Sequence, residues 1–213
     1  MADGFLEKSF ENLRDRKKTI TKANNKSLSA LLKKNRSYRG YDQRYRVTRE
    51  SLEQIVSVNE LLPSAKSQQA LRFYLVTDAK DAAVVLSNIK LGGTLPELHL
   101  PFEGAEPMAF IVMCTTVAES KMLHIDAGIS AQSMLLKAVE LGYNGIIIGA
   151  FNAKNIKQAF DLNYEPILIL AIGKGSENIQ LIETDENASR AYYREEGVHY
   201  VPKISWKELI INK

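Results

Sequence analysis

The 213-residue chain carries 28 Lys and Arg against 25 Asp and Glu, which gives a formal net charge of +3. Hydrophobic residues make up 45% and charged residues 25%, average values for a globular protein that exclude disordered and collagen-like classes. The single cysteine, Cys114, excludes an intramolecular disulfide and a multi-cysteine zinc site. No apolar run reaches membrane-spanning length and the start lacks the apolar stretch of a secretory signal, so a cytoplasmic protein is expected.

The charge is unevenly distributed. Residues 1–50 hold 14 Lys and Arg against 6 Asp and Glu, whereas residues 51–213 hold 14 against 19. A basic N-terminal quarter suits an anionic ligand, a nucleic-acid arm or a solvated amphipathic helix. No stripe of aromatic and basic residues and no zinc knuckle accompanies it, so we expect no nucleic-acid partner.

The N-terminal part is predicted to be helical. Residues 3–22 form a basic pattern with apolar positions on one face, and we expect residues 1–26 to be an extension of a single domain over residues 27–213. Ser27 or Ser29 is then expected to cap a short helix.

A loop is predicted over residues 36–46, and a helix from Thr48 whose apolar stripe extends to Leu61 and Leu62 before Pro63. Beyond it we expect strands at 73–77, 110–115, 146–148 and 167–172, helices at 81–88, 120–141 and 154–160, an irregular loop at 91–107, and an extended arm at 190–203.

The helix over 120–141 has the strongest pattern, and Gly142 lies where a left-handed cap residue is expected. Apolar strands separated by helices predict a sheet covered on both faces, in one α+β or α/β domain. The expected apolar stripe of the long helix is Ile125, Ile129, Gln132, Leu135, Leu136 and Val139.

No side chain is predicted to be catalytic. The histidines are far apart, so no metal site is expected, and Cys114 lies within an apolar strand where a thiol is usually inert. Gly173-Lys174-Gly175 lacks the third glycine of the dinucleotide fingerprint and is predicted to form a turn. If the protein is an enzyme, a cofactor is therefore expected to carry the chemistry.

Two segments are candidates for ligand binding. Arg36, Ser37 and Arg39 follow the short helix, and their forked guanidiniums and hydroxyl suit a phosphate group, although a solvated basic loop is the alternative. The segment 63–73 has six consecutive small or polar side chains directly before a strand. Such residues let the backbone approach a flat ligand, although an ordinary helix-to-strand connection is the alternative.

These segments resemble the nitroreductase family of FMN-dependent oxidoreductases. That family has a helix ending in Arg-Arg-Ser-x-Arg-x-aromatic, followed by Ala-Pro-Ser-x-x-Asn-x-Gln-Pro-Trp-x-Phe before a strand. Further similarity lies in residues 126–143, 147–151 and 201–203, so the resemblance covers about residues 31–209. The matching positions are Arg36, Ser37, Arg39 and Tyr41 in the first pattern, and Pro63, Ser64, Gln69 and Phe73 in the second.

The resemblance implies a nitroreductase fold, with a mixed central sheet flanked by helices, in an intertwined homodimer with FMN at the interface. Asp126 and Gly128 are expected to have structural roles, Gly128 through close packing in the dimer core. The implied FMN contacts are Arg36, Ser37, Arg39 and Lys203 for the phosphate and ribityl chain, Gln69 from the same side, Pro63, Ser64 and Ser67 from the partner subunit, and Ile148, Gly149 and Ala150 near the ring.

The sequence departs from the family pattern at three places. Asn35 replaces the first arginine and Ser67 replaces the asparagine, which removes a charge and a larger amide and is expected to lower flavin affinity. Ala70-Leu71 replaces Pro-Trp, which changes the wall of the cleft.

The resemblance implies a ping-pong reaction in which NADH or NADPH reduces the flavin at N5, and a nitroaromatic, quinone or similar small molecule then accepts the electrons. One alternative is an FMN-binding protein that NAD(P)H does not reduce, such as a dehalogenase-like, flavin-consuming or sensor protein. The other is a non-enzymatic basic dimer that docks on an anionic partner.

Overall fold

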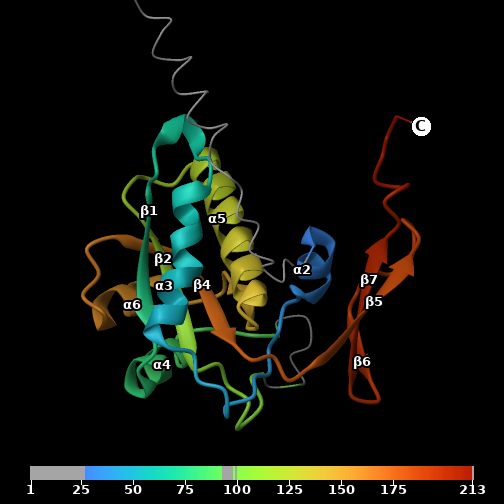
Figure 1. The fold of residues 1–213 in the computed structure, drawn as a ribbon, viewed down its shortest axis with the longest axis horizontal. Coiled ribbons are helices and arrows are strands. Elements are labelled where there is room, and N and C mark those ends of the chain that lie inside the picture. The colour runs from blue at the N-terminus through green and yellow to red at the C-terminus, as the bar shows by residue number, and fades with distance from the viewer. Residues whose placement is uncertain (1–26, 93–97, 99, 213) are drawn as a thin grey trace, which may run out of the picture.

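The computed structural model of the protein describes residues 27–92, 98 and 100–212, so the predicted N-terminal helix and extension lie outside the described residues. A central sheet has the strand order β1-β2-β4-β3, and each neighbouring pair is antiparallel (Figure 1). The four strands are β1 (Leu71–Val76), β2 (Ala109–Thr115), β3 (Asn144–Ile148) and β4 (Glu165–Gly173).

Helices cover both faces of this sheet, as the continuous apolar strands predict. Ser27, Thr48 and Ser120 each begin a helix by accepting a backbone N–H with the side-chain oxygen. The helices are α2 (Leu28–Lys34), α3 (Arg49–Val56), α4 (Ala79–Leu86), α5 (Lys121–Glu140) and α6 (Ala153–Ala159), and two short 3₁₀ helices are η1 (Ser57–Leu61) and η2 (Ala65–Ser67).

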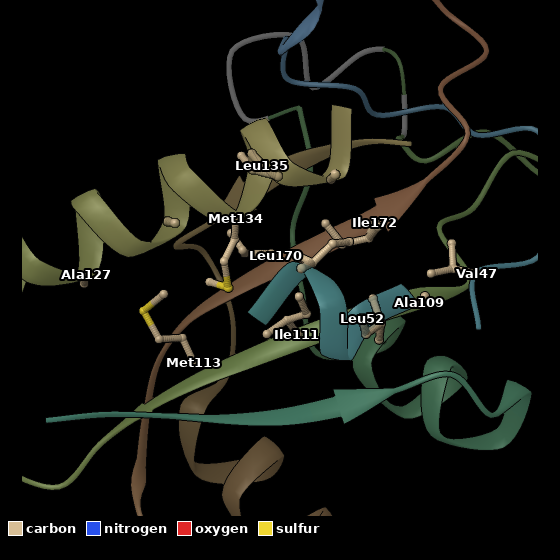
Figure 2. Close-up of a cluster of buried hydrophobic side chains, with 13 residues drawn as sticks. Val47, Leu52, Ala109, Ile111, Met113, Ala127, Met134, Leu135, Leu170 and Ile172 are labelled. Carbon is tan, nitrogen blue, oxygen red and sulfur yellow. The ribbon is translucent and has the colours of Figure 1, made fainter. Parts of the chain in front are cut away.

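The first face of the sheet packs against α3 and α5. Figure 2 shows Met134 of α5 and Leu52 of α3 lying over strand residues that include Ile111 and Leu170. All four side chains are fully buried. This packing fixes the position of α5, which forms one wall of the candidate site.

The second face packs against α4 and α6. Because β2 alternates its side chains, Phe110 and Val112 point to this face and contact a cluster that includes Val85 and Ile156. Cys114 belongs to the same cluster, and burial raises the pKa of its thiol to about 11. The thiol therefore stays protonated at neutral pH, which agrees with the predicted inert role.

A second, smaller sheet follows β4 and has the order β5-β7-β6. β5 and β7 are parallel, and β6 and β7 are antiparallel. Figure 1 shows this sheet to one side of the central sheet, with α2 between it and α5. The predicted extended arm corresponds to β6 and β7, whereas β5 was not predicted. The strands are β5 (Asn178–Thr184), β6 (Tyr193–Glu195) and β7 (Val198–Ile204).

Two predicted apolar stripes are partly wrong. Leu61 is 84% exposed, because the α-helix ends at Val56 and the tighter 3₁₀ turn of η1 rotates later residues off its buried face. In α5, Leu135 and Val139 are buried as predicted, but Ile125 is 45% exposed. The buried face of α5 combines small residues with larger apolar ones, and it includes Ala127, Ser130, Ala131, Met134 and Ala138.

The predicted turn at residues 173–175 is also wrong. β4 continues through Gly173, and the backbone stays extended so that Gly175 forms a bridge with Tyr41. A Cβ atom at Gly173 would lie 2.6 Å from Cδ1 of Tyr41, and one at Gly175 would lie 2.2 Å from Cδ1 of Tyr38. These glycines are therefore needed for the close approach of two tyrosine rings and not for a turn.

Replacing Gly175 by alanine is expected to lower the free energy of unfolding by about 1–3 kcal/mol, because the new methyl group overlaps the Tyr38 ring. Chemical denaturation of the purified protein measures this loss. Gly149→Ala is the matched control, because a Cβ atom there would meet nothing within 4 Å. Equal stability of the two variants would contradict the packing argument.

Candidate functional site

The loop after α2 is fixed between two parts of the fold. The Tyr38 N–H donates to the Gly145 carbonyl at 3.2 Å, and Ser37 forms a bridge with Gly145 at the start of β3. A Cβ atom at Gly145 would lie 2.5 Å from the Ala171 carbonyl oxygen of β4, so glycine is needed where β3 lies against that strand. The side chains of the loop therefore extend from a fixed backbone.

Glu177 holds the other side of this loop. Its carboxylate accepts hydrogen bonds from the backbone N–H groups of Arg39 and of Gly40, the latter at 3.0 Å, and it forms an ion pair with Arg194. The Glu177 side chain is only 8% exposed. A buried carboxylate with several charge-assisted donors is well compensated, so Glu177 ties the loop to the small sheet.

A cavity of about 300 Å³ lies between this loop, α5, β3 and the small sheet. The predicted phosphate-binding residues Arg36, Ser37, Arg39 and Lys203 all line it, although Lys203 is more than 160 positions away in the sequence. The structure thus brings these four predicted residues together. Apolar side chains line the same cavity, namely Leu135, Ile147, Ile179 and Val201.

Several buried nitrogen atoms at or near this cavity have no hydrogen-bond partner. Within the part of the chain that the structure describes, the buried Nε atoms of Arg36, Arg39 and Arg194 and Nδ1 of His199 have no hydrogen-bond partner. Burial lowers the pKa of Arg36 from its usual value, but a guanidinium stays charged at neutral pH. Since unpaired buried donors are costly, this arrangement suits a ligand with several anionic oxygen atoms.

Both loop arginines are held in place. Arg36 donates to the Leu32 carbonyl at 2.6 Å, and Arg39 donates to the Ser37 carbonyl at 3.1 Å. The Arg39 guanidinium also lies 5.0 Å from the centre of the Tyr192 ring. These contacts use the terminal nitrogens and ring stacking, and they restrict the rotamers of both guanidiniums before any ligand binds.

The segment 63–69 forms a strained turn at a second cavity, of about 200 Å³, which Pro63, Ser64 and Gln69 line. Its left-handed residues are Lys66, Ser67 and Gln69, with φ of 54°, 53° and 46°. Such a backbone persists only where the surroundings hold it.

Asp126 of α5 supplies part of that support. Its carboxylate accepts the Ala65 N–H at 3.0 Å, and the Ser64 hydroxyl oxygen accepts the Gln69 N–H at 3.2 Å. The structural role predicted for Asp126 is therefore confirmed. The structure places Gln69 beside Pro63 and Ser64, and not among the cations where it was predicted to act.

Ile148, Gly149 and Ala150 lie at the end of β3. The Ile148 side chain is 3% exposed and packs in the core, so only its backbone remains for a ligand. Gly149 is exposed, and Ala150 lines a third cavity with Asn88 and Lys90. Within one chain, the predicted site residues that line a cavity are thus divided among three separate cavities.

Sequence reasoning missed several residues of the cation-lined cavity. Tyr192 and His199 line it, and Glu177 and Arg194 lie close to it. His199 had been considered only as a metal ligand. The available signal was the spacing of His199, Val201 and Lys203, because alternate residues of an extended strand share one face.

Over residues 27–92, 98 and 100–212, no three His, Cys, Asp or Glu side chains gather as a metal site. No helix in those same ranges is long and apolar enough to cross a membrane.

Comparison with known proteins identifies the family of this chain. The model of the nitroreductase family matches residues 32–174. The chain is 22% identical over 183 residues to YdgI of Bacillus subtilis (strain 168), which is named as an NAD(P)H nitroreductase, with 69% of this chain and 88% of that protein covered.

Solved structures have the same fold. An FMN-dependent nitroreductase from Clostridium difficile R20291 is 25% identical, with a TM-score of 0.56 and coverage of 70% of this chain and 87% of that one. A nitroreductase from Exiguobacterium sibiricum 255-15 in complex with FMN is 20% identical, with a TM-score of 0.59 and coverage of 72% and 90%. The chain belongs to the nitroreductase family.

Proposed function

We propose that this protein is an FMN-dependent oxidoreductase that takes hydride from NADH or NADPH and passes electrons to an electron-poor acceptor such as a nitroaromatic or a quinone. The observation that carries the proposal is the cavity where Arg36, Ser37, Arg39 and Lys203 meet apolar side chains. A phosphate ester with a polyol chain and an aromatic ring matches both the cationic and the apolar side chains of this cavity. Family membership and the FMN complex of the Exiguobacterium relative support the choice of flavin.

The roles of the residues follow from their chemistry. Arg36, Ser37, Arg39 and Lys203 would bind the phosphate and ribityl chain, and the unpaired buried Nε atoms of Arg36 and Arg39 fit that role. The exposed backbone at Gly149 and Ala150 would lie near the ring. Apolar walls at Leu135 and Ile147 would exclude water from the ligand.

When bound, FMN supplies two-electron redox chemistry at N5, and its alternating reaction with donor and acceptor makes the cycle ping-pong. The protein contributes position and electrostatics. Cations held before the ligand arrives stabilise negative charge in a cavity of low dielectric constant, at no cost of reorganisation. No side-chain nucleophile is required, and Cys114 is buried in the core, away from the cation-lined cavity.

A homodimer would complete the site. Pro63 and Ser64 line a cavity separate from the cations, so within one chain they do not contact the same ligand. On the outer face of α5, Met122 and Ile125 are 46% and 45% exposed, and a Cβ atom at Gly128 would meet nothing within 4 Å. Such an apolar face suits a second copy, whose Pro63, Ser64 and Ser67 would reach the flavin.

Replacing Arg36 and Arg39 together by alanine is expected to weaken FMN binding by roughly 100-fold or more, because two charge-assisted phosphate contacts are lost. Flavin content after purification and titration of the apoprotein with FMN measure the effect. The control is the double replacement of Arg44 and Arg49, which removes the same charge from exposed ion pairs. Retention of FMN by the first variant would contradict the proposed clamp.

A shared site predicts complementation between two defective variants. In one variant Arg36 and Arg39 become alanine, and in the other Ser67→Trp fills the space proposed for the partner's flavin. Subunits mixed after partial denaturation are expected to form heterodimers with one intact site of two, which binds FMN. Failure of the mixture to bind FMN, with heterodimers detected by native mass spectrometry, would contradict a site built from both subunits.

The visible spectrum of the purified protein tests the reaction. Flavin bands are expected to bleach under argon when NADPH or NADH is added, and to return when a quinone follows. Bands that persist with both nucleotides would favour a family member that NAD(P)H does not reduce. A colourless protein that also fails to take up FMN would refute the proposed cofactor.

A further inference from the structure

The small sheet carries a buried histidine that the reaction above does not use. His199 lies in β7, is 3% exposed and lines the cation-rich cavity. Its Nδ1 has no hydrogen-bond partner among the described residues. The residue lies beyond positions 32–174, to which the family model matches, so its role must be argued from this chain alone.

Positive charge surrounds this histidine. Arg194 is its register partner across β6 and β7, and the Arg39 guanidinium stacks on Tyr192, whose ring centre lies 5.1 Å from that of His199. Glu177 pairs with Arg194 and with the Arg39 backbone, so two cations face one carboxylate. The net charge of these three groups is therefore +1, in a region that is largely shielded from water.

The histidine is poised to donate a hydrogen bond. Burial and then the charges of Arg194 and Arg39 lower the pKa of His199 from its ordinary value, so the ring is neutral at pH 7. A neutral imidazole has one N–H donor and one acceptor nitrogen. Because cations lie close to this donor, an anionic oxygen is its most favourable hydrogen-bond acceptor.

We propose that His199 is a phosphate-binding residue and that, with Arg39, it donates to the phosphate group of FMN. A phosphate offers three oxygen atoms and about two negative charges, which suit the unpaired Nε of Arg39 and, in the tautomer with its proton on Nδ1, the unpaired Nδ1 of His199. Arg194, the register partner of His199 on β6, adds positive charge beside the histidine. This inference rests on the proposed function, because it takes FMN as the ligand.

The proposal assigns a binding role to the small sheet as a whole. Val201 and Lys203 share a face of β7 with His199, and Ile179 of β5 is the register partner of His199. The sheet would therefore close over the ligand opposite the loop at residues 36–39. Glu177 links these two parts, so the histidine and Arg39 keep a fixed relation.

Riboflavin provides the test, because it has the ring and ribityl chain of FMN but no phosphate. Two variants distinguish the hydrogen-bond donor of His199 from its aromatic ring. His199→Phe keeps an aromatic side chain beside Tyr192, and His199→Asn keeps an amide donor near the position of Nδ1. His124→Ala is the matched control, since its side chain is 59% exposed. Quenching of flavin fluorescence in phosphate-free buffer gives the Kd for both flavins.

We expect His199→Phe to weaken FMN binding by roughly 10–100-fold and to leave riboflavin binding nearly unchanged. His199→Asn is expected to retain most of the FMN affinity, and His124→Ala all of it. Should the phenylalanine variant fail to fold, the wild-type preference for FMN over riboflavin must persist in His199→Asn for the proposal to stand.

Equal losses for FMN and riboflavin would overturn the proposal, because they would place His199 at the ring or in packing. Unchanged FMN binding by His199→Phe would overturn it as well. Wild-type protein that binds neither flavin would refute the proposed function itself, a failure that is distinct from the other two.

Discussion

The buried carboxylate of Glu177 is the constraint on which the candidate site depends. It accepts backbone N–H groups from the loop that carries Arg39 and pairs with Arg194 of the small sheet. These parts are about 140 residues apart in the sequence, and this link acts together with the contact between the Arg39 guanidinium and the Tyr192 ring. Because its partners are a guanidinium and two backbone N–H groups, the carboxylate of Glu177 has hydrogen-bond donors that compensate its burial.

The same carboxylate limits the charge of the cavity. Four cations, Arg36, Arg39, Arg194 and Lys203, surround or approach the cavity, and Glu177 offsets one of them. Strong mutual repulsion would otherwise destabilise the protein before a ligand binds. The remaining positive charge matches an anionic ligand. The unpaired nitrogens of Arg36 and Arg39 are available to form hydrogen bonds with that ligand.

Much of the fold could be predicted because its strands are apolar and its helices begin with clear capping residues. Ser27, Thr48 and Ser120 all cap helices in the structure. By contrast, no residue of β5 is fully buried, and its partly buried residues are separated by exposed ones. Its hydrophobic pattern was therefore too weak to distinguish a strand from a loop. The face of α5 was misjudged because small residues such as Ala131, and not the larger Ile125, pack against the sheet.

The site could be predicted only where a local motif carried it. Arg36, Ser37 and Arg39 are adjacent and were found, and Lys203 was found through the family resemblance. The role of Glu177 depends on a contact across 138 positions with Arg39, which no local spacing reveals. Gly173 and Gly175 were predicted to form a turn, but they are needed because of the neighbouring tyrosine rings, which only the packing shows.

The structure also accounts for the replacement of the family's first arginine by Asn35. Asn35 is 9% exposed, and its side-chain amide donates to Oε1 of Gln132 at 3.3 Å, which ties the loop to α5. A guanidinium at this position would add a further cation beside Arg36, whose own guanidinium already lines the cavity. The departure from the family pattern therefore exchanges a positive charge for a neutral amide that holds the loop against α5.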